Sequence, residues 1–152
     1  MYRKPLLAAA AVLALGIISV FATGCDSTGN NTQNEAVISA VNILDKAGLH
    51  DIDTSINADK KIPATAQATA LHLQAVLTLT DWPRDLKDPA KKLAALLDVM
   101  GKALNGDKPD MKAAGDAAHD VHEAGHDFSS AVYKYLYKQA KITDPNASKA
   151  GD

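Results

Sequence analysis

The chain has 152 residues, of which 47% are hydrophobic but only 5% aromatic, and its formal net charge is −2. This length fits one domain plus a segment removed in processing, and the weak acidic balance argues against nucleic-acid binding, which requires clustered Lys and Arg. Much of the apolar content is alanine, and glycine and proline stand mostly between the apolar segments. We therefore expect an all-helical fold.

The N-terminal residues have the layout of a secretory signal peptide. Arg3 and Lys4 give a basic start, an apolar run covers 6–21, and three small residues precede Cys25. The apolar run of about 16 residues would be roughly 24 Å long as a helix, which is short for a permanent membrane span. Residues 1–24 are therefore predicted to be an export signal that is cleaved off.

Cys25 is the only cysteine, so no disulfide can form within the chain. The sequence ATGC at 22–25 resembles the lipobox of bacterial lipoproteins, with Ala22 where that family usually has leucine. The resemblance implies cleavage before Cys25 and a diacylglycerol, with acyl chains such as palmitate, on its thiol. Two acyl chains suffice for stable anchoring, so the chain is expected on the periplasmic or extracellular face of a bacterial membrane. A plain spanning anchor, or secretion with a free thiol, are the alternatives.

The rest of the chain divides into a tether, a domain and a tail. Residues 25–33 are polar and small, apart from the lipidated Cys25, and cannot pack a core, so they are predicted to be a flexible tether. Residues 34–141 carry the helical patterns and form the predicted bundle domain. Residues 142–152 are predicted to be a disordered tail.

Four long helices are predicted within the domain, because apolar residues recur there every three or four positions. The first covers 34–47 and ends at Gly48, a natural C-terminal stop. The polar stretch from there to Ile62 has one or two helical turns, with His50 in a loop. The other three helices are predicted at 63–80, from Asp88 to Leu104, and at 109–141.

Prolines indicate where two of these helices begin. Pro63 fits the first turn of the second helix, and Asp88 is a good N-cap with Pro89 at the first helical position. Trp82, in the loop at 81–89, is expected to cap one end of the core. Amphipathic helices joined by short loops predict an antiparallel four-helix-type bundle.

The stretch HDVHEAGHDF at 119–128 contains three of the five histidines. On a helix, His119, His122 and His126 lie within about 60° of one another, beside the apolar face. Neutral imidazole is a preferred ligand for transition metals, and residues three or four apart on a helix can share one ion. The pattern predicts a zinc or copper site whose remaining ligands come from other helices.

Further residues are candidates for the same site. His72, in the apolar stripe of the second long helix, is a further candidate ligand, and would be the second axial ligand if the group were non-covalent haem. Glu123 and Asp127 are candidate ligands or partners of ligands, and Tyr133 and Tyr137 fall on the histidine stripe. The alternative is a structural seam, because His and Tyr at the border of a bundle bury a ring and keep a polar tip in water. His72 also fits a hydrogen-bonded core position.

The sequence contains no motif of an enzyme: no GxSxG, Walker loop or dinucleotide fingerprint. Ser129 lies within one turn of His126, but no acid follows that would orient the ring, so no catalytic residue is assigned. Two function classes remain, a lipoprotein that binds a metal ion and an envelope-structural or protein-interaction lipoprotein without a ligand. The second predicts an exposed apolar or tyrosine-rich patch, with Tyr133, Tyr135 and Tyr137 as candidates.

Overall fold

The computed structural model describes residues 27–145. In this range the chain is helical and has no strand, and its five helices are α1 (Ser27–Asp45), α2 (Leu49–Asn57), α3 (Ala66–Leu79), α4 (Arg84–Ala103) and α5 (Met111–Ala140). The predicted signal peptide and Cys25 lie outside the described residues, as does the tail beyond residue 145. None of the helices in 27–145 combines the length and the apolar character that crossing a bilayer requires.

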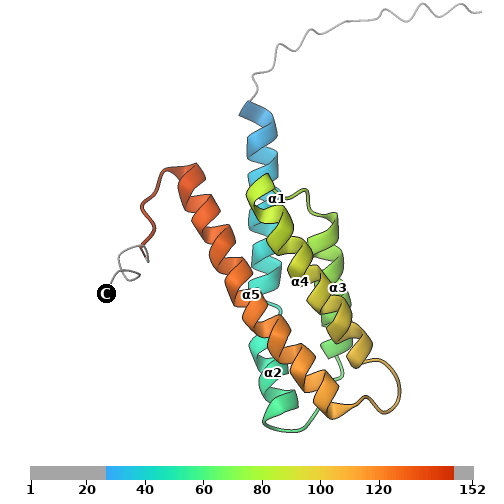
Figure 1. The fold of residues 1–152 in the computed structure, drawn as a ribbon. Helices are drawn as coiled ribbons and strands as arrows, with labels where there is room; N and C mark the ends of the chain where they lie inside the picture. Colours follow the sequence, from blue (N-terminus) through green and yellow to red (C-terminus); the bar gives the residue numbers. More distant parts are fainter. Residues whose placement is uncertain (1–26, 146–152) are drawn as a thin grey trace, which may run out of the picture.

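The helices form an antiparallel bundle in which α1 and α2 together occupy the position of one helix (Figure 1). α3 packs against α4, α4 against α5, and α5 against both α1 and α2, while α1 also contacts α3. Each side of the bundle is therefore closed by a helix–helix contact. The predicted all-α, four-helix-type bundle is confirmed.

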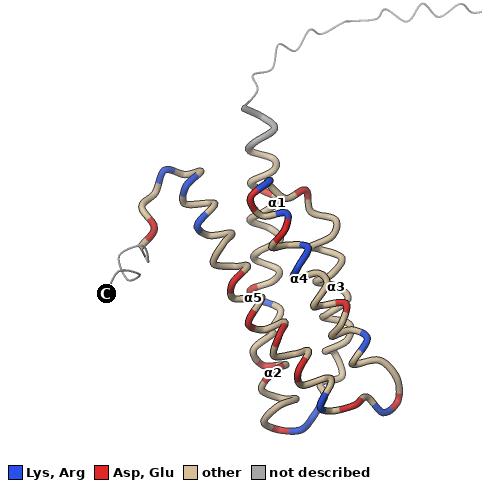
Figure 2. The backbone as a smooth tube through the Cα atoms, in the orientation of Figure 1, with Lys and Arg blue, Asp and Glu red and all other residues tan. Residues whose placement is uncertain are grey.

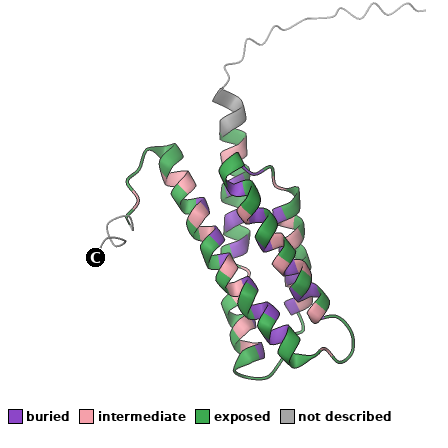
Figure 3. Ribbon diagram, viewed as in Figure 1, coloured by how far each residue is buried: buried purple, intermediate pink, exposed green. Residues whose placement is uncertain are grey.

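Buried side chains lie on the faces that the helices turn toward one another (Figure 3). Trp82, between α3 and α4, is only 4% exposed and covers one end of this core, as predicted. Its indole Nε1 donates to the carbonyl of Leu77 at 2.7 Å, and its ring meets Phe128 edge to face. The largest of the almost fully enclosed side chains are aliphatic: Ile56, Leu73, Leu93, Leu97, Met100, Val37, Val41, Val121 and Val132.

The break between α1 and α2 is caused by Gly48, whose φ of 68° places it in the left-handed region. Glycine adopts this conformation without a steric penalty because it has no Cβ. The stop at Gly48 is thus confirmed, but the loop expected for His50 is wrong. The amide of Ile52 bonds the carbonyl of Gly48 at 3.0 Å, so α2 begins directly after the break and His50 lies in its first turn.

α1 begins earlier than expected, at Ser27, within the segment 25–33 that was predicted to be a flexible tether. That segment is polar but contains no proline, so nothing in its covalent structure prevents the helix from extending toward its N-terminus. The side chain of Gln33 also donates to the carbonyl of Asp81 at 3.2 Å. The polar segment is therefore part of the helix from Ser27 onward.

α4 also begins earlier than expected, at Arg84, so Asp88 is not its N-cap and Pro89 lies inside the helix. A proline at this point removes one backbone hydrogen bond, to the carbonyl four residues before it. The first turn remains closed, because the amides of Leu86 and Lys87 both bond the carbonyl of Pro83. The helix can therefore start before the proline and include it.

α5 is the longest helix and carries the three clustered histidines. Its N-cap is Asp110, whose side chain accepts hydrogen bonds from the amides of Lys112 and Ala113 at 2.8 and 2.9 Å. These bonds satisfy donors that the first turn leaves without a helical partner. The helix continues without interruption through Gly115 and Gly125, so the histidine stretch is helical throughout.

Candidate metal centre

α2 and α5 face each other with two matched rows of polar side chains. In each row the second residue follows the first by three positions and the third follows the second by four, a spacing that puts all three on one face of a helix. Since the two helices run in opposite directions, the start of one row lies opposite the end of the other. The rows are His119, His122 and His126 on α5, and His50, Asp53 and Asn57 on α2.

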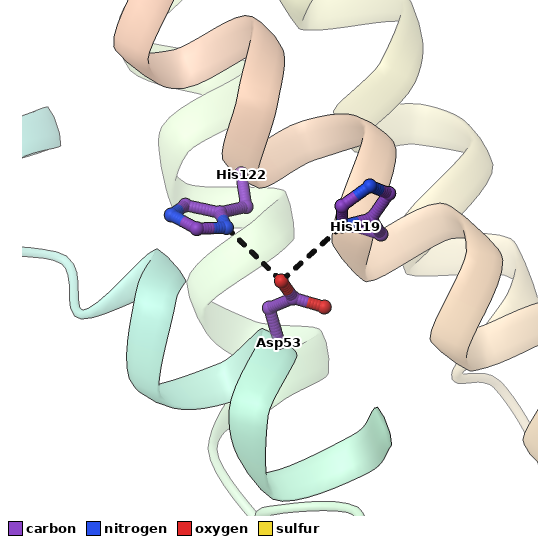
Figure 4. A group of neighbouring side chains, drawn as sticks. All are labelled: Asp53, His119 and His122. Carbon is purple, nitrogen blue, oxygen red and sulfur yellow. Dashed lines mark hydrogen bonds and ion pairs between the residues drawn. The ribbon is translucent and has the colours of Figure 1, made fainter. Parts of the chain in front are cut away.

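Asp53 joins two of the α5 histidines from across the helix contact (Figure 4). Its Oδ2 lies 3.0 Å from His122 Nδ1 and 3.4 Å from His119 Nδ1. The side chains of Asp53 and His122 are each 13% exposed, while that of His119 is 60% exposed. These three side chains offer ligand atoms that all lie within 4.8 Å of one another.

The carboxyl of Asp53 is ionised at neutral pH. Burial by itself raises the pKa of Asp53, but hydrogen bonds from Asn57, His122 and His119 outweigh it and hold the pKa below its usual value of 3.8. The Asn57 amide donates to Asp53 Oδ1 at 2.6 Å and to the carbonyl of Gly115 at 2.9 Å. A carboxylate can only accept hydrogen bonds, so Nδ1 of His122 carries the hydrogen in their contact.

The other ring nitrogen of His122 points to two further histidines. His122 Nε2 lies 2.9 Å from His126 Nε2 and 3.4 Å from His50 Nδ1. These three rings border a surface hollow of about 410 Å³, whose lining also includes Asp45 and Asp51. His122 is thus a shared member of two groups, one on each side of its ring.

His72, the candidate ligand from the second long helix, does not reach these groups. It is exposed on α3 and lines a hollow together with Ile43 of α1 and Lys46, which follows α1; neither α2 nor α5 contributes to this hollow. It is therefore not a core histidine either. α3 buries a face that includes Ala66 and Ala70, and His72 lies on another face. Because His72 lies away from α2 and α5, it is also not placed to share a haem with the other histidines.

The two acids predicted near the histidines have different positions. Glu123 Oε1 lies 3.9 Å from His122 Nδ1, but its side chain is 64% exposed. Asp127 lines a different hollow, next to Lys92 and Leu93 of α4. Of these two acids, Glu123 is the one that lies within 4 Å of a histidine nitrogen.

Two of the three tyrosines of α5, Tyr133 and Tyr135, make hydrogen bonds within the domain, and the ring of Tyr137 lies 6.4 Å from that of Tyr133. Tyr133 donates to Asp45 Oδ2 at 2.7 Å, and this bond raises the pKa of Tyr133. Tyr135 donates to Asn34 Oδ1 at 3.1 Å, and Ser129 donates to Asp45 Oδ1 at 2.7 Å. These contacts join α5 to α1. They extend the row of polar contacts that α5 makes with α2.

Sequence reasoning missed Asp53 and placed His50 in a loop, although a signal for both was present. The spacing of His50, Asp53 and Asn57 repeats that of the α5 histidines, with the buried Ile52 and Ile56 between them. A short polar stretch with apolar residues four apart is the pattern of an amphipathic helix. The same spacing in both rows would have made this stretch a candidate for a helix with a matching polar face.

The charge around the histidines is predominantly negative (Figure 2). Acidic residues recur along α2 and the first half of α5, where Lys112 is the one basic residue and pairs with Asp116 at 2.6 Å. An acidic surface raises the local concentration of cations.

The contact between α2 and α5 therefore collects four imidazoles and one carboxylate, which are ligand types that zinc and copper bind. Two imidazoles, those of His119 and His122, meet the carboxylate of Asp53. The other two meet His122 on its opposite nitrogen. No protein-family model matches the chain, and no curated protein and no solved structure matches it either.

Proposed function

We propose that this chain is an exported, lipid-anchored lipoprotein whose helical domain binds one divalent transition-metal ion, zinc or copper, through His122. The observation that carries the metal-binding proposal is the position of the His122 ring. Its side chain is 13% exposed. Its Nδ1 lies 3.0 Å from Asp53, which also contacts His119, and its Nε2 lies within 3.5 Å of His50 and His126. An ion on either side of the ring would find at least two more protein ligands.

Addition of zinc to the full chain, purified in detergent, is expected to raise its melting temperature. A ligand at 100 times its Kd stabilises the folded state by about 2.7 kcal/mol, which corresponds to a shift of roughly 5–15 °C for a domain of this size. The variant His122→Ala is expected to show no shift, because it removes the side chain that both groups share. Differential scanning calorimetry with and without zinc measures this, and a chelator should reverse the shift.

The matched control is His72→Ala, which removes an exposed histidine lying away from α2 and α5. This variant should keep the full zinc-dependent shift. If the wild-type chain melts at the same temperature with and without excess zinc and excess copper, the polar rows are a hydrogen-bonded seam and the metal-binding proposal is wrong.

The lipid anchor is proposed on the basis of the first 25 residues alone. In bacteria fed radiolabelled palmitate, the wild-type chain should incorporate the label and fractionate with membranes, because thioether-linked diacylglycerol provides two acyl chains. Cys25→Ser should lose the label and remain at the size of the uncleaved precursor. Unlabelled wild-type protein in the soluble fraction would refute the anchor and leave the metal site untouched.

A module that binds another protein without a ligand is the second candidate. It is supported by exposed apolar side chains beside the hollow between α1 and α3, where Leu79 is 83% and Ile43 is 38% exposed. Exposed apolar patches mark protein contacts. The calorimetric experiment separates the two candidates, since a module without a ligand shows no zinc-dependent shift.

A further inference from the structure

This inference rests on the proposed function, in which His122 binds one metal ion. We infer that this ion sits at Nε2 of His122, with His50 and His126 as its other protein ligands. Asp53 then acts as a positioning residue that holds the His122 ring, and His119 is not a ligand. This assigns the site to three imidazoles from two helices, instead of the three α5 histidines expected from the sequence.

The contact with Asp53 determines which nitrogen of His122 is available. The carboxylate accepts the hydrogen of His122 Nδ1 at 3.0 Å, so in the neutral ring the lone pair is on Nε2. A metal-bound histidine typically donates its other ring N–H to a carboxylate, which fixes the orientation of the ring. The pair formed by Asp53 and His122 has this arrangement, with Nε2 directed toward His50 and His126.

The three nitrogens at this point cannot all satisfy one another by hydrogen bonding. His122 Nε2 has one lone pair in the ring plane, yet it faces both His126 Nε2 at 2.9 Å and His50 Nδ1 at 3.4 Å. One neighbour can donate to that lone pair and the other has no acceptor there. A cation removes the conflict, because each imidazole then contributes a lone pair.

Two of the three nitrogen separations are close to those of a zinc site. The third, between His50 and His126, has to close when an ion binds, because among the described residues only Asp53, His119 and His122 offer ligand atoms that already lie within 4.8 Å of one another. Zinc–nitrogen bonds of 2.0–2.1 Å in a tetrahedron put neighbouring nitrogens about 3.4 Å apart. The separation between His50 and His122 already has this value, and the 2.9 Å between His122 and His126 has to widen by about half an ångström. His50 and His126 are exposed, so their rings can make this adjustment, and the adjoining hollow leaves room for water as the fourth ligand.

The opposite side of the ring is a poorer site. Asp53 accepts hydrogen bonds from three side chains there, Asn57, His119 and His122. An ion bound between Asp53, His119 and His122 would break the contacts of both histidines with the carboxylate, and Asn57 would compete for it. On the Nε2 side an ion replaces at most one hydrogen bond.

Zinc titration of the full chain in detergent, measured by calorimetry on a set of variants, tests the assignment. Asp53→Asn is expected to weaken zinc binding by about 10- to 100-fold, with one zinc ion still bound per chain. His50→Ala and His126→Ala each remove a proposed ligand and are expected to weaken zinc binding at least as much. His119→Ala, which removes the histidine on the other side of Asp53, should bind zinc like the wild type. Circular dichroism of the zinc-free variants verifies that each is folded.

A second measurement on the wild-type chain identifies the nitrogen directly. In long-range proton–nitrogen NMR spectra, zinc should shift the Nε2 resonance of His122 while Nδ1 remains protonated. Zinc binding that is lost in His119→Ala but kept in His50→Ala and His126→Ala, or a zinc-induced shift at Nδ1, would overturn this assignment and leave the proposed function standing. A wild-type chain that takes up no zinc would overturn both.

Discussion

Replacing Trp82 with alanine is expected to lower the free energy of unfolding by about 3–5 kcal/mol. The indole is 4% exposed, its Nε1 donates to the carbonyl of Leu77 at 2.7 Å, and its ring lies 5.1 Å from that of Phe128 at 86°. The substitution therefore opens a cavity at the end of the core and removes an edge-to-face aromatic pair. Urea unfolding followed by far-UV circular dichroism measures the loss, since the variant has no tryptophan fluorescence.

The variant Trp82→Phe separates the two contributions. It keeps an aromatic ring against Phe128 but leaves the carbonyl of Leu77 without the indole donor. A buried acceptor that loses its partner costs about 1–3 kcal/mol, so this variant should fall between the wild type and Trp82→Ala. If Trp82→Ala unfolded at the wild-type urea concentration, the loop between α3 and α4 would not cover the core as described.

Gly115→Ala is expected to destabilise the domain by about 2 kcal/mol, although alanine is the better helix former. A Cβ at Gly115 would collide with Oδ1 of Asn57. That side chain cannot move away freely, because its Nδ2 donates both to Asp53 and to the carbonyl of Gly115. The substitution should therefore push α2 away from α5, release Asp53, and weaken zinc binding together with stability.

Gly101→Ala is the matched control, a glycine inside α4. There a new Cβ would lie 3.4 Å from Cδ2 of Leu71, a side chain that is 50% exposed and free to shift. The helix propensity of alanine should dominate and stabilise the domain by about 0.5–1 kcal/mol. Equal effects of the two substitutions in urea unfolding would mean that the contact between α2 and α5 at Gly115 is not as close as described.

The helical fold follows from the sequence wherever large aliphatic residues define a face. Val37, Val41 and Leu44 on α1 and Leu93, Leu97 and Met100 on α4 are all buried, as their spacing predicts. The second long helix is different. Its spacing favours a core stripe that proves wrong, because all of its residues are exposed: Ala64, Ala68, Leu71, Ala75 and Leu79. Alanines and leucines surround most of α3, so periodicity alone does not determine its buried face. Packing against the other helices buries Ala66, Ala70, Leu73 and Leu77. Leu71, His72 and Leu79 are exposed.

The candidate site was predictable in part. A helical wheel groups His119, His122 and His126 correctly on one face of α5, because that grouping depends only on local geometry. It cannot show which helix lies opposite α5. The sequence therefore suggested His72 as the additional ligand, whereas the residues next to the α5 histidines are His50 and Asp53. It also cannot show that Asp53 divides the α5 histidines into two groups, since that depends on how α2 and α5 are aligned along their axes.

The shortness of α2 has a consequence for the whole contact. A helix of nine residues is not stable alone in water, where about 12–15 residues are needed even for favourable sequences. Between Gly48 and the loop before α3, this segment keeps its helical form only while it is seated on α5. On the proposed site, ion binding and the helical form of this segment would therefore favour each other, because α2 supplies His50, one of the three proposed protein ligands.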